Sequence, residues 1–541
     1  TMKKRNRFLL SFLILVAILT GACSNSGEIS SIIEVDTSTE VNPSQNSETV
    51  EVVSPSANAK FSEEQQSQGS VSYLFSPIRS TSTYLMDAAG NALYTWESVY
   101  TPGNAVYLLE NGNLLHTGSV KPSKFDAGGS GGIIEEIAPD STVLWNYQYA
   151  DDQVQQHHDI EQMPNGNILI IAWEMKTKAE AIAAGRNPNL LSEGELWPDH
   201  IVEVDPNTKN VVWEWHVWDH LVQDFDPSKE NYGVVGEHPE LIDTNLTNRK
   251  AAADWNHINS IDYNAELDQL LLSVHSFSEV WIIDHNTSTE EAVGTAGDLL
   301  YRWGNPQAYD SGSSSDQQFY VQHDAQWIPD GYPGAGNVLV FNNGDQRNRP
   351  YSSVDEIVLP LNPDGSYTYT GMPYGPEAPV WTYVAENPSD FFADHISGAQ
   401  RLLNGNTLIC SGTEGIFFVV TPAGEIVWRY GYNEEVFRVI RYEADYPGLP
   451  NLKSESIRPI PTASDAGKPA GGQSNGQQGQ RPRLDFASAS AKLDITEEAL
   501  KTALGAPPPD FAAAAAQLGI TEQELIAALG IPAGEFLNGG E

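Results

Sequence analysis

The first regularity in the chain is a recurring pair of apolar stretches separated by a polar turn, in which the second stretch ends near a tryptophan. IVEVDPNTKNVVWEW and IFFVVTPAGEIVWRY are the clearest examples. Apolar and polar residues that alternate on either side of a turn rich in Asp, Asn, Pro and Gly predict a β-hairpin. The pattern occurs six times, at 84–96, 133–145, 201–213, 280–303, 354–381 and 416–428. The tryptophans are spaced by 49, 68, 90, 78 and 47 residues, which indicates a repeat with loop insertions.

A second pattern precedes five of these hairpins. It consists of a slot residue, a turn of the Pro-Asn-Gly-Asn type about six positions later, and then an apolar strand such as Ile168 to Ile171. It is found at 103–113, 158–167, 257–266, 323–332 and 397–406. Each repeat therefore contains two hairpins, or four strands. Six units of four strands predict the blades of a β-propeller.

The sequence thus predicts an all-β protein with a six-bladed β-propeller over residues 69–445. The first unit lacks the inner pattern, so its inner strands must come from residues 71–76 or from the chain after Trp428. Pairing of the two ends would close the ring. A parallel β-helix is the alternative architecture, and it would show shorter and more regular coils.

The N-terminal segment has the pattern of an export signal. Residues 1–23 combine a basic start, an apolar run from Phe8 to Leu19 that is too short to span a bilayer, and small residues before Cys23. This end resembles a bacterial lipobox, which predicts lipidation of Cys23; ordinary secretion with cleavage near Ala22 is the alternative. Residues 24–68 are polar and predict a disordered tether. We therefore expect an exported bacterial lipoprotein, periplasmic or at the cell surface, that contacts the membrane only through this lipid.

The C-terminal part differs in composition from the rest. Residues 446–483 read as a Gly/Gln/Pro-rich linker, and 484–541 as a two-copy helical module with a period of 25 residues. Thr521 and Glu524 have capping-box spacing. Small apolar faces are expected at Leu500, Leu504, Leu525 and Leu529. The module has no catalytic pattern and is expected to act as a spacer or to dock a partner.

The charge of the chain narrows the possible ligands. Its 72 acidic and 29 basic residues give a formal net charge of −43, which argues against nucleic acid as a partner. An anionic substrate would also be repelled at long range, so a local site would have to overcome that field. The second cysteine, Cys410, lies in an apolar run and is expected to be a buried thiol in a strand.

Histidines recur in the slot of the second pattern. Aligned repeats place Asn104, His158, His257, His323 and Ser397 in this slot. Because the innermost strand of each blade lines the central channel, three histidines from consecutive blades are expected to converge on the axis. A shared ancestral repeat could also carry them without any chemistry.

Further polar residues accompany these histidines. His157 precedes His158, Asn259 lies two positions after His257, and His275 follows on the next strand of the same blade. Asp159 and Asp324 directly follow two of the slot histidines and would face the other way on a regular strand, unless the turn rotates them.

Converging imidazoles are compatible with more than one function. They could hold a metal such as Zn²⁺ and hydrolyse an ester or a sulfate. They could also act without metal, as nucleophile, proton shuttle and anion clamp. A propeller without catalysis, displaying a binding surface, is the third possibility.

Several motifs together resemble the bacterial arylsulfotransferase family over most of residues 70–440. They are HHDIEQMPNGN (157–167), DWNHINSIDYNAELDQLLLS (254–273), LLYRWGNP (299–306), QHDAQWIP (322–329) and GAQRLLNGNTLI (398–409). The resemblance implies a six-bladed propeller. It also implies transfer of a sulfuryl group, without metal or other cofactor, from an aryl sulfate donor to a phenol acceptor through a sulfohistidine.

The resemblance also implies roles for particular residues. His323 matches the nucleophile, and His257 the histidine that protonates the leaving phenolate. His158 and Asn259 match residues that bind the sulfuryl oxygens, and we place His157 and His275 beside them as substrate-binding. The family has an arginine on the strand after the DWxHxN motif, whereas this chain reads Leu-Ser-Val-His from position 272. His275, Arg401 or Arg347 could replace that arginine.

Overall fold

The computed structural model describes residues 71–121, 123–246, 252–371, 373–452 and 458–460, together with scattered positions between 490 and 525. The predicted signal peptide, Cys23 and the tether lie outside the described residues, as does most of the linker. None of the described helices has the length and apolarity that a membrane crossing requires.

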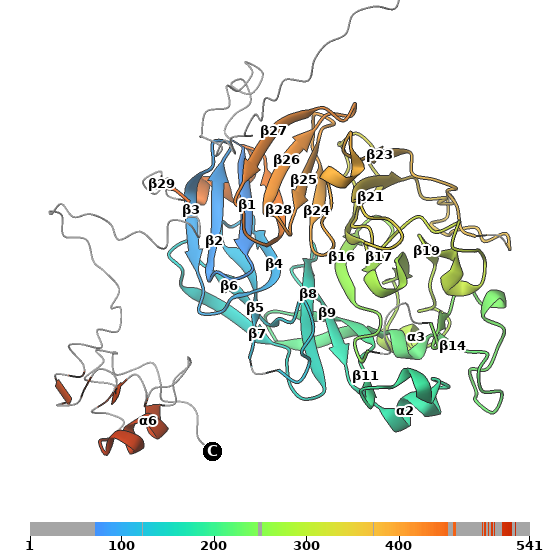
Figure 1. The fold of residues 1–541 in the computed structure, drawn as a ribbon, viewed down its shortest axis with the longest axis horizontal. Coiled ribbons are helices and arrows are strands. Elements are labelled where there is room, and N and C mark those ends of the chain that lie inside the picture. The colour runs from blue at the N-terminus through green and yellow to red at the C-terminus, as the bar shows by residue number, and fades with distance from the viewer. Residues whose placement is uncertain are drawn as a thin grey trace, which may run out of the picture. The chain divides into compact units, whose positions relative to one another are not determined.

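The described part of the propeller consists of six antiparallel sheets arranged around one axis (Figure 1). The strands of each blade are given from the innermost outward. Blade 1 is β28 (Val436–Tyr442), β1 (Ser72–Pro77), β2 (Ser82–Asp87) and β3 (Asn91–Glu97), and blade 2 is β4 (Pro102–Leu108), β5 (Leu114–Ser119), β6 (Gly132–Ile137) and β7 (Val143–Gln148). Blade 3 is β8 (Val154–Gln162), β9 (Ile168–Glu174), β12 (Asp199–Asp205) and β13 (Asn210–His216). Blade 4 is β16 (Ile258–Asn264), β17 (Gln269–Val274), β18 (Glu279–Asp284) and β19 (Tyr301–Trp303); blade 5 is β20 (His323–Trp327), β21 (Val338–Asn342), β22 (Ser353–Ile357) and β23 (Trp381–Tyr383); blade 6 is β24 (Gly398–Arg401), β25 (Thr407–Ser411), β26 (Ile416–Val420) and β27 (Ile426–Gly431).

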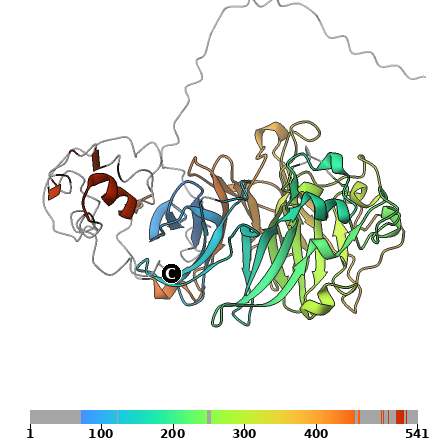
Figure 2. The same cartoon turned by 90° about the horizontal axis from the view of Figure 1, so that it is seen from below.

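The innermost strands contact one another in a closed circle, β28 to β4, β8, β16, β20, β24 and back to β28. Figure 2 shows the same blades in a view turned by 90°. The predicted six-bladed propeller is confirmed. Because every ladder within the blades is antiparallel, the alternative of a parallel β-helix is wrong.

The ring closes as expected by pairing both ends of the propeller. β28 pairs with β1 in antiparallel register, with Leu74 opposite Ile440, so both candidate segments contribute to blade 1. A short edge strand, β29 (Arg458–Pro459), pairs with β3 and lies within the stretch that the sequence assigns to the linker. In their described residues the long insertions carry small elements. They are several 3-10 turns, α2 (Lys178–Ala183), α3 (Thr289–Ala292), the β10–β11 pair (Lys176–Thr177 and Glu195–Leu196) and the β14–β15 pair (Leu221–Val222 and Ile242–Asp243).

The repeated tryptophans tie each blade to the next. In five blades the indole Nε1–H donates to an acceptor in the turn before the outermost strand of the following blade. The pairs are Trp145 to Pro206 O (2.8 Å), Trp213 to Thr287 Oγ1 (3.2 Å), Trp303 to Pro376 O (2.8 Å), Trp381 to Pro422 O (2.9 Å) and Trp428 to Ala88 O (2.9 Å). Indole suits this position because it combines a large apolar surface with a single donor.

Blade 1 makes its tie differently. The hydroxyl of Tyr94 donates to Pro139 O in the turn of blade 2, while Trp96 Nε1 is buried and finds no acceptor among the described residues. The ring of outer ties is therefore complete, with a tyrosine in place of one tryptophan.

A second set of ties lies at the inner edges of blades 3 to 6. Three carboxylates each accept from a backbone N–H of the next inner strand. They are Asp159 to Ile261 N (3.4 Å), Asp262 to Trp327 N (2.6 Å) and Asp324 to Ala399 N (2.9 Å). Neighbouring blades are thus held at their inner and outer edges.

The C-terminal module is described only in part. α6 (Phe511–Leu518) is helical, and Leu500 and Leu525 are fully buried against Ala514 and Ala515, as the pattern predicted. Leu504, Leu529 and Glu524 lie outside the described residues. Within the propeller, Cys410 is buried in β25, which confirms the expected strand thiol.

A matched pair of substitutions tests the tryptophan ties. Trp428→Phe and Trp96→Phe remove the same atoms from equivalent positions, but only Trp428 donates a hydrogen bond. We expect Trp428→Phe to lower the free energy of unfolding by about 1 kcal/mol more than Trp96→Phe. Urea unfolding of the two variants measures this difference, and equal losses would show that the indole N–H contributes nothing.

Candidate active site

The slot predicted from the repeats is a local irregularity of the inner strands. The backbone is left-handed at Asn104 (φ 94°), His158 (φ 52°), His257 (φ 56°) and Ser397 (φ 86°), and the strand register shifts at this point in blades 2 to 5. In blade 5 the slot residue His323 is not left-handed, but Val321 (φ 51°) before it and Asp324 (φ 54°) after it are. A β-bulge re-aims the side chains beside it. A histidine and the aspartate after it can therefore both face the channel.

The structure brings five imidazoles together in an unbroken row. Ring centroids lie 5.2 Å apart for His157 and His158, 4.6 Å for His158 and His257, 4.9 Å for His257 and His275, and 5.3 Å for His275 and His323. The convergence of three slot histidines is thus observed, and both neighbours join them. His257 is the most open to solvent, with 13% of its side chain exposed.

His157 supports the row from behind. Its ring stacks on Trp173 at 3.9 Å, its Nε2 lies 2.9 Å from Asp199 Oδ1, and its Nδ1 lies 2.9 Å from His158 Nδ1. Burial lowers the pKa of both His157 and His158 well below the usual range, so both rings are neutral at neutral pH.

His158 lies against a glycine-rich loop. Its backbone N–H donates to Gly129 O at 2.9 Å, and a Cβ on Gly129, where φ is +79°, would come within 2.1 Å of the imidazole. Only glycine fits there, because of both this contact and the left-handed backbone. The repeat patterns do not include this loop, although the run Gly-Gly-Ser-Gly-Gly at 128–132 is a visible signal in the sequence.

His257 is oriented by a carboxylate that the sequence analysis did not single out. Its Nδ1 lies 2.5 Å from Asp254 Oδ2, and Asp254 Oδ1 accepts from Trp173 Nε1 at 3.0 Å. Burial alone would raise the pKa of Asp254, but the charge and hydrogen bond of His257 together lower it. Asp254 is therefore ionised, and its contact with Nδ1 fixes the orientation of the His257 ring. The available signal was the DWNH spacing itself.

The protonation of His323 is determined by its partner. Asn343 Nδ2 donates to Ala393 O (2.7 Å) and Ile396 O (2.8 Å), so the other amide atom, Oδ1, must be an acceptor. Oδ1 lies 2.8 Å from His323 Nδ1, which must then carry the proton. Burial lowers the pKa of His323 to about 3, although the Asn343 hydrogen bond opposes this. His323 is thus neutral, with an unprotonated Nε2. Nothing in the sequence pattern indicated Asn343.

Three further residues that the sequence suggested for the site lie in different surroundings. Asn259 is buried, and its Nδ2 donates to Gln322 O at 2.8 Å, directly before His323. Arg401 is paired with Glu356 at 2.5 Å and lies over Trp381. Arg347 is exposed in the loop between β21 and β22. Of the three candidates for the expected arginine, only His275 lies within the row.

The arrangement also bears on the metal alternative. No group of three or more His, Cys, Asp or Glu side chains among the described residues is placed to hold a metal ion. What the site offers is a row of mostly buried ring nitrogens, of which those of His157, His158 and His323 are neutral, with one ionised carboxylate beside His257. That set suits binding of an anionic group and nucleophilic attack by nitrogen.

The protein is thus a six-bladed β-propeller in which buried imidazoles from several blades lie close together at the inner strands. The profile of the Arylsulfotransferase (ASST) family matches residues 58–446. This match covers well over half of the chain, and the chain therefore belongs to the arylsulfotransferase family.

Individual relatives are distant. Arylsulfate sulfotransferase AssT of Escherichia coli is 23% identical over 341 residues, which cover 56% of this chain and 53% of that protein, so the chain spans about half the length of this relative. A protein of unknown function from Bacteroides caccae matches 69% of this chain and 99% of its own, with 13% identity and a TM-score of 0.40. A putative 6-phosphogluconolactonase from Bacteroides fragilis matches 69% of this chain and 98% of its own, with 10% identity and a TM-score of 0.36.

The buried neutral His323 makes a prediction about acid stability. Its folded pKa of about 3 lies below the value of about 6.5 for an unfolded histidine. As the pH falls below about 6.5, the unfolded chain gains a proton that the folded protein cannot bind, so the folded state loses stability until about pH 3. We expect His323→Gln to gain stability relative to wild type between about pH 7.5 and about pH 4.5.

Thermal melts across this pH range measure the effect. His238→Gln is the control, because the His238 side chain is 42% exposed and lies outside the row. A His323→Gln difference that stays constant with pH would contradict the assignment of a neutral, buried ring.

Proposed function

We propose that the protein transfers a sulfuryl group from an aryl sulfate to a phenolic acceptor through a sulfohistidine at His323. Family membership and the likeness to AssT support aryl sulfotransferase activity. The observation that supports this mechanism most directly is the hydrogen bond from His323 Nδ1 to Asn343 Oδ1, which leaves the lone pair on Nε2. A neutral imidazole nitrogen in a buried site is a competent nucleophile.

In the first half-reaction, Nε2 of His323 attacks sulfur, the N–S bond forms and the S–O(aryl) bond breaks. The leaving phenolate takes a proton from His257. The imidazole of His323 then carries the sulfuryl group on Nε2 and a proton on Nδ1, and Asn343 Oδ1 stabilises the positive charge of that ring. Asp254 stabilises the protonated form of His257 before the proton is given up.

In the second half-reaction, His257 takes the proton of the incoming phenol, whose oxygen attacks sulfur. The N–S bond breaks and its electron pair returns to Nε2 of His323, which restores the starting state. Donor and acceptor thus use the same proton-transferring group in turn, and ping-pong kinetics follow.

His158, His275, Asn259 and His157 complete the proposal as groups that bind or orient the sulfuryl oxygens. Sulfuryl transfer resembles phosphoryl transfer in that charge spreads over peripheral oxygens, so fixed N–H donors in a dry site are effective. His275 takes the place of the arginine that the family resemblance led us to expect, so the clamp in this chain is an imidazole. We also propose that the protein works outside the cytoplasm, tethered through Cys23.

The nucleophile is tested by mass spectrometry of the intact protein after brief exposure to nitrophenyl sulfate. We expect one sulfuryl group on the peptide that contains His323, and loss of both the adduct and the transfer to phenol in His323→Ala. His395→Ala serves as a control at an exposed histidine. Wild-type turnover in His323→Ala would exclude His323 as the nucleophile.

The proton-transfer role is tested by Asp254→Asn. General acid catalysis of this kind contributes about 100-fold or more, and it matters most for poor leaving groups. We therefore expect Asp254→Asn to lower kcat at least about tenfold with phenyl sulfate, and less with nitrophenyl sulfate, whose phenolate leaves more readily. Steady-state kinetics with both donors measure this.

The matched control is Asp298→Asn, because Asp298 makes a similar contact of 2.8 Å to His220 Nδ1 outside the row. Its rates with the two donors should change equally, if at all. Equal losses with both donors in Asp254→Asn would mean that Asp254 has only a structural role.

A further inference from the structure

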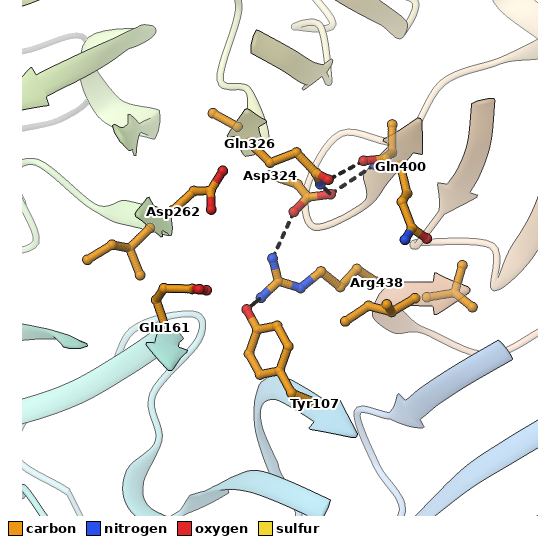
Figure 3. A pocket seen from close by; sticks show the side chains of 12 residues that line it. Tyr107, Glu161, Asp262, Asp324, Gln326, Gln400 and Arg438 are labelled. Atoms are coloured by element: carbon orange, nitrogen blue, oxygen red, sulfur yellow. Dashed lines mark hydrogen bonds and ion pairs between the residues drawn. The ribbon is translucent and has the colours of Figure 1, made fainter. Parts of the chain in front are cut away.

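The channel contains a second polar layer beyond the histidines. A cavity of about 160 Å³ is lined by residues that follow the slot positions along the inner strands, among them Glu161, Asp262, Asp324, Gln326 and Arg438. Figure 3 shows that the carboxylate of Glu161 points toward the guanidinium of Arg438, while that of Asp262 points into the same space. Of this layer, the sequence patterns pointed only to Asp324 and its counterpart Asp159.

Arg438 is the hub of this layer. It belongs to β28, the strand that closes the ring, and its side chain spans the channel. Nη1 donates to Asp324 Oδ1 at 2.8 Å, and Nη2 donates to Asp159 Oδ1 and to the hydroxyl of Tyr107. One guanidinium therefore joins blade 1 to blades 2, 3 and 5.

The two carboxylates that Arg438 joins directly follow two of the imidazoles in sequence. Asp159 follows His158, and Asp324 follows His323. The left-handed backbone lies at the histidine in blade 3 (His158) and at the aspartate in blade 5 (Asp324). Non-glycine residues keep such a conformation only where their surroundings fix it. The ion pairs with Arg438 lie directly beside both positions.

The charges of the layer make Arg438 hard to replace. Among the cavity-lining residues, Arg438 is the cation that faces the carboxyl groups. Burial and repulsion by Asp262 raise the pKa of Glu161, and burial raises the pKa of Asp262 to about 7. Burial also raises the pKa of Asp159, against the effect of Arg438. Without the guanidinium, Asp159 and Asp324 would be left without their counter-charge.

We infer that Arg438 is a positioning residue that sets the separation of His158 and His323 from beneath, by bridging Asp159 and Asp324. The neighbouring residue strengthens this link, because the ring of Phe437 lies 6.0 Å from that of His158. The kinetic part of this inference rests on the proposed function, whereas the geometric part does not.

Two substitutions and a matched control test it. Arg438→Lys keeps the charge but cannot bridge two carboxylates in a fork, and Arg438→Met removes the charge. Arg401→Met is the control, because Arg401 is similarly buried and paired with Glu356 at 2.5 Å, away from the histidines. Thermal melts establish that each full-length variant is folded at the assay temperature.

The first readout needs no substrate. In protein labelled with ¹⁵N-histidine, the ring signals of His158 and His323 are identified by His158→Gln and His323→Gln. We expect both to shift in Arg438→Lys and Arg438→Met and to stay in place in Arg401→Met. Unshifted signals in folded Arg438→Met would overturn the inference, whether or not the protein is a sulfotransferase.

The second readout is the rate of transfer between aryl sulfate and phenol. A misplacement of about 1 Å costs about 100-fold in rate, so we expect Arg438→Met to lower kcat by about that factor with a much smaller change in KM. Added guanidinium at millimolar concentration should restore part of the rate in Arg438→Ala and none in Arg401→Ala. Wild-type kcat in Arg438→Met would overturn the inference. Absence of transfer in wild type would instead count against the proposed function.

Discussion

The contact between one blade and the next is the constraint on which the rest of this structure depends. A propeller has no single sheet or helix that spans the molecule, so the angle between blades is fixed only where neighbouring blades touch. Here the outer edges are joined by an indole or phenol donor, and the inner edges of blades 3 to 6 by a carboxylate that accepts from the next strand. His158, His257 and His323 come from three successive blades. The distances between these three imidazoles therefore depend on how each blade contacts the next.

Burial gives the histidine row its chemical character. An imidazole taken out of water favours its neutral form, and neighbouring imidazoles oppose one another's protonation. His323 is left with an unprotonated Nε2, while His257 has the ionised Asp254 beside its Nδ1. Two histidines in one row thus have partners of different charge, Asn343 and Asp254. The net charge of −43 repels anions at long range, so an anionic ligand at this site would depend on local donors and not on the long-range field.

The features that follow from the repeats were predicted well from the sequence. Six tryptophan-ended hairpins, the shared slot and the closure of blade 1 follow from patterns of apolar residues, and these patterns reflect the packing of each strand between two blades. Asn343, Asp254 and Gly129 lie instead on connections that differ between blades. Their distance from the row depends on the path of each loop, which local periodicity does not encode. For Arg401 the sequence led to the opposite error. Its place in a family motif made it a candidate for the site, but its side chain forms an ion pair with Glu356.

The offset in blade 5 shows how a small departure from the repeat can matter. In blade 3 the left-handed residue is His158, and in blade 5 it is Asp324, although the motifs align His158 with His323. The bulge allows each His-Asp pair to serve two layers, with the imidazole in the row above and the carboxylate on Arg438 below. A shift of the bulge by one position changes the orientation of the His323 ring relative to the His158 ring. Equivalent positions of two blades thereby present their imidazoles in different local backbone geometry.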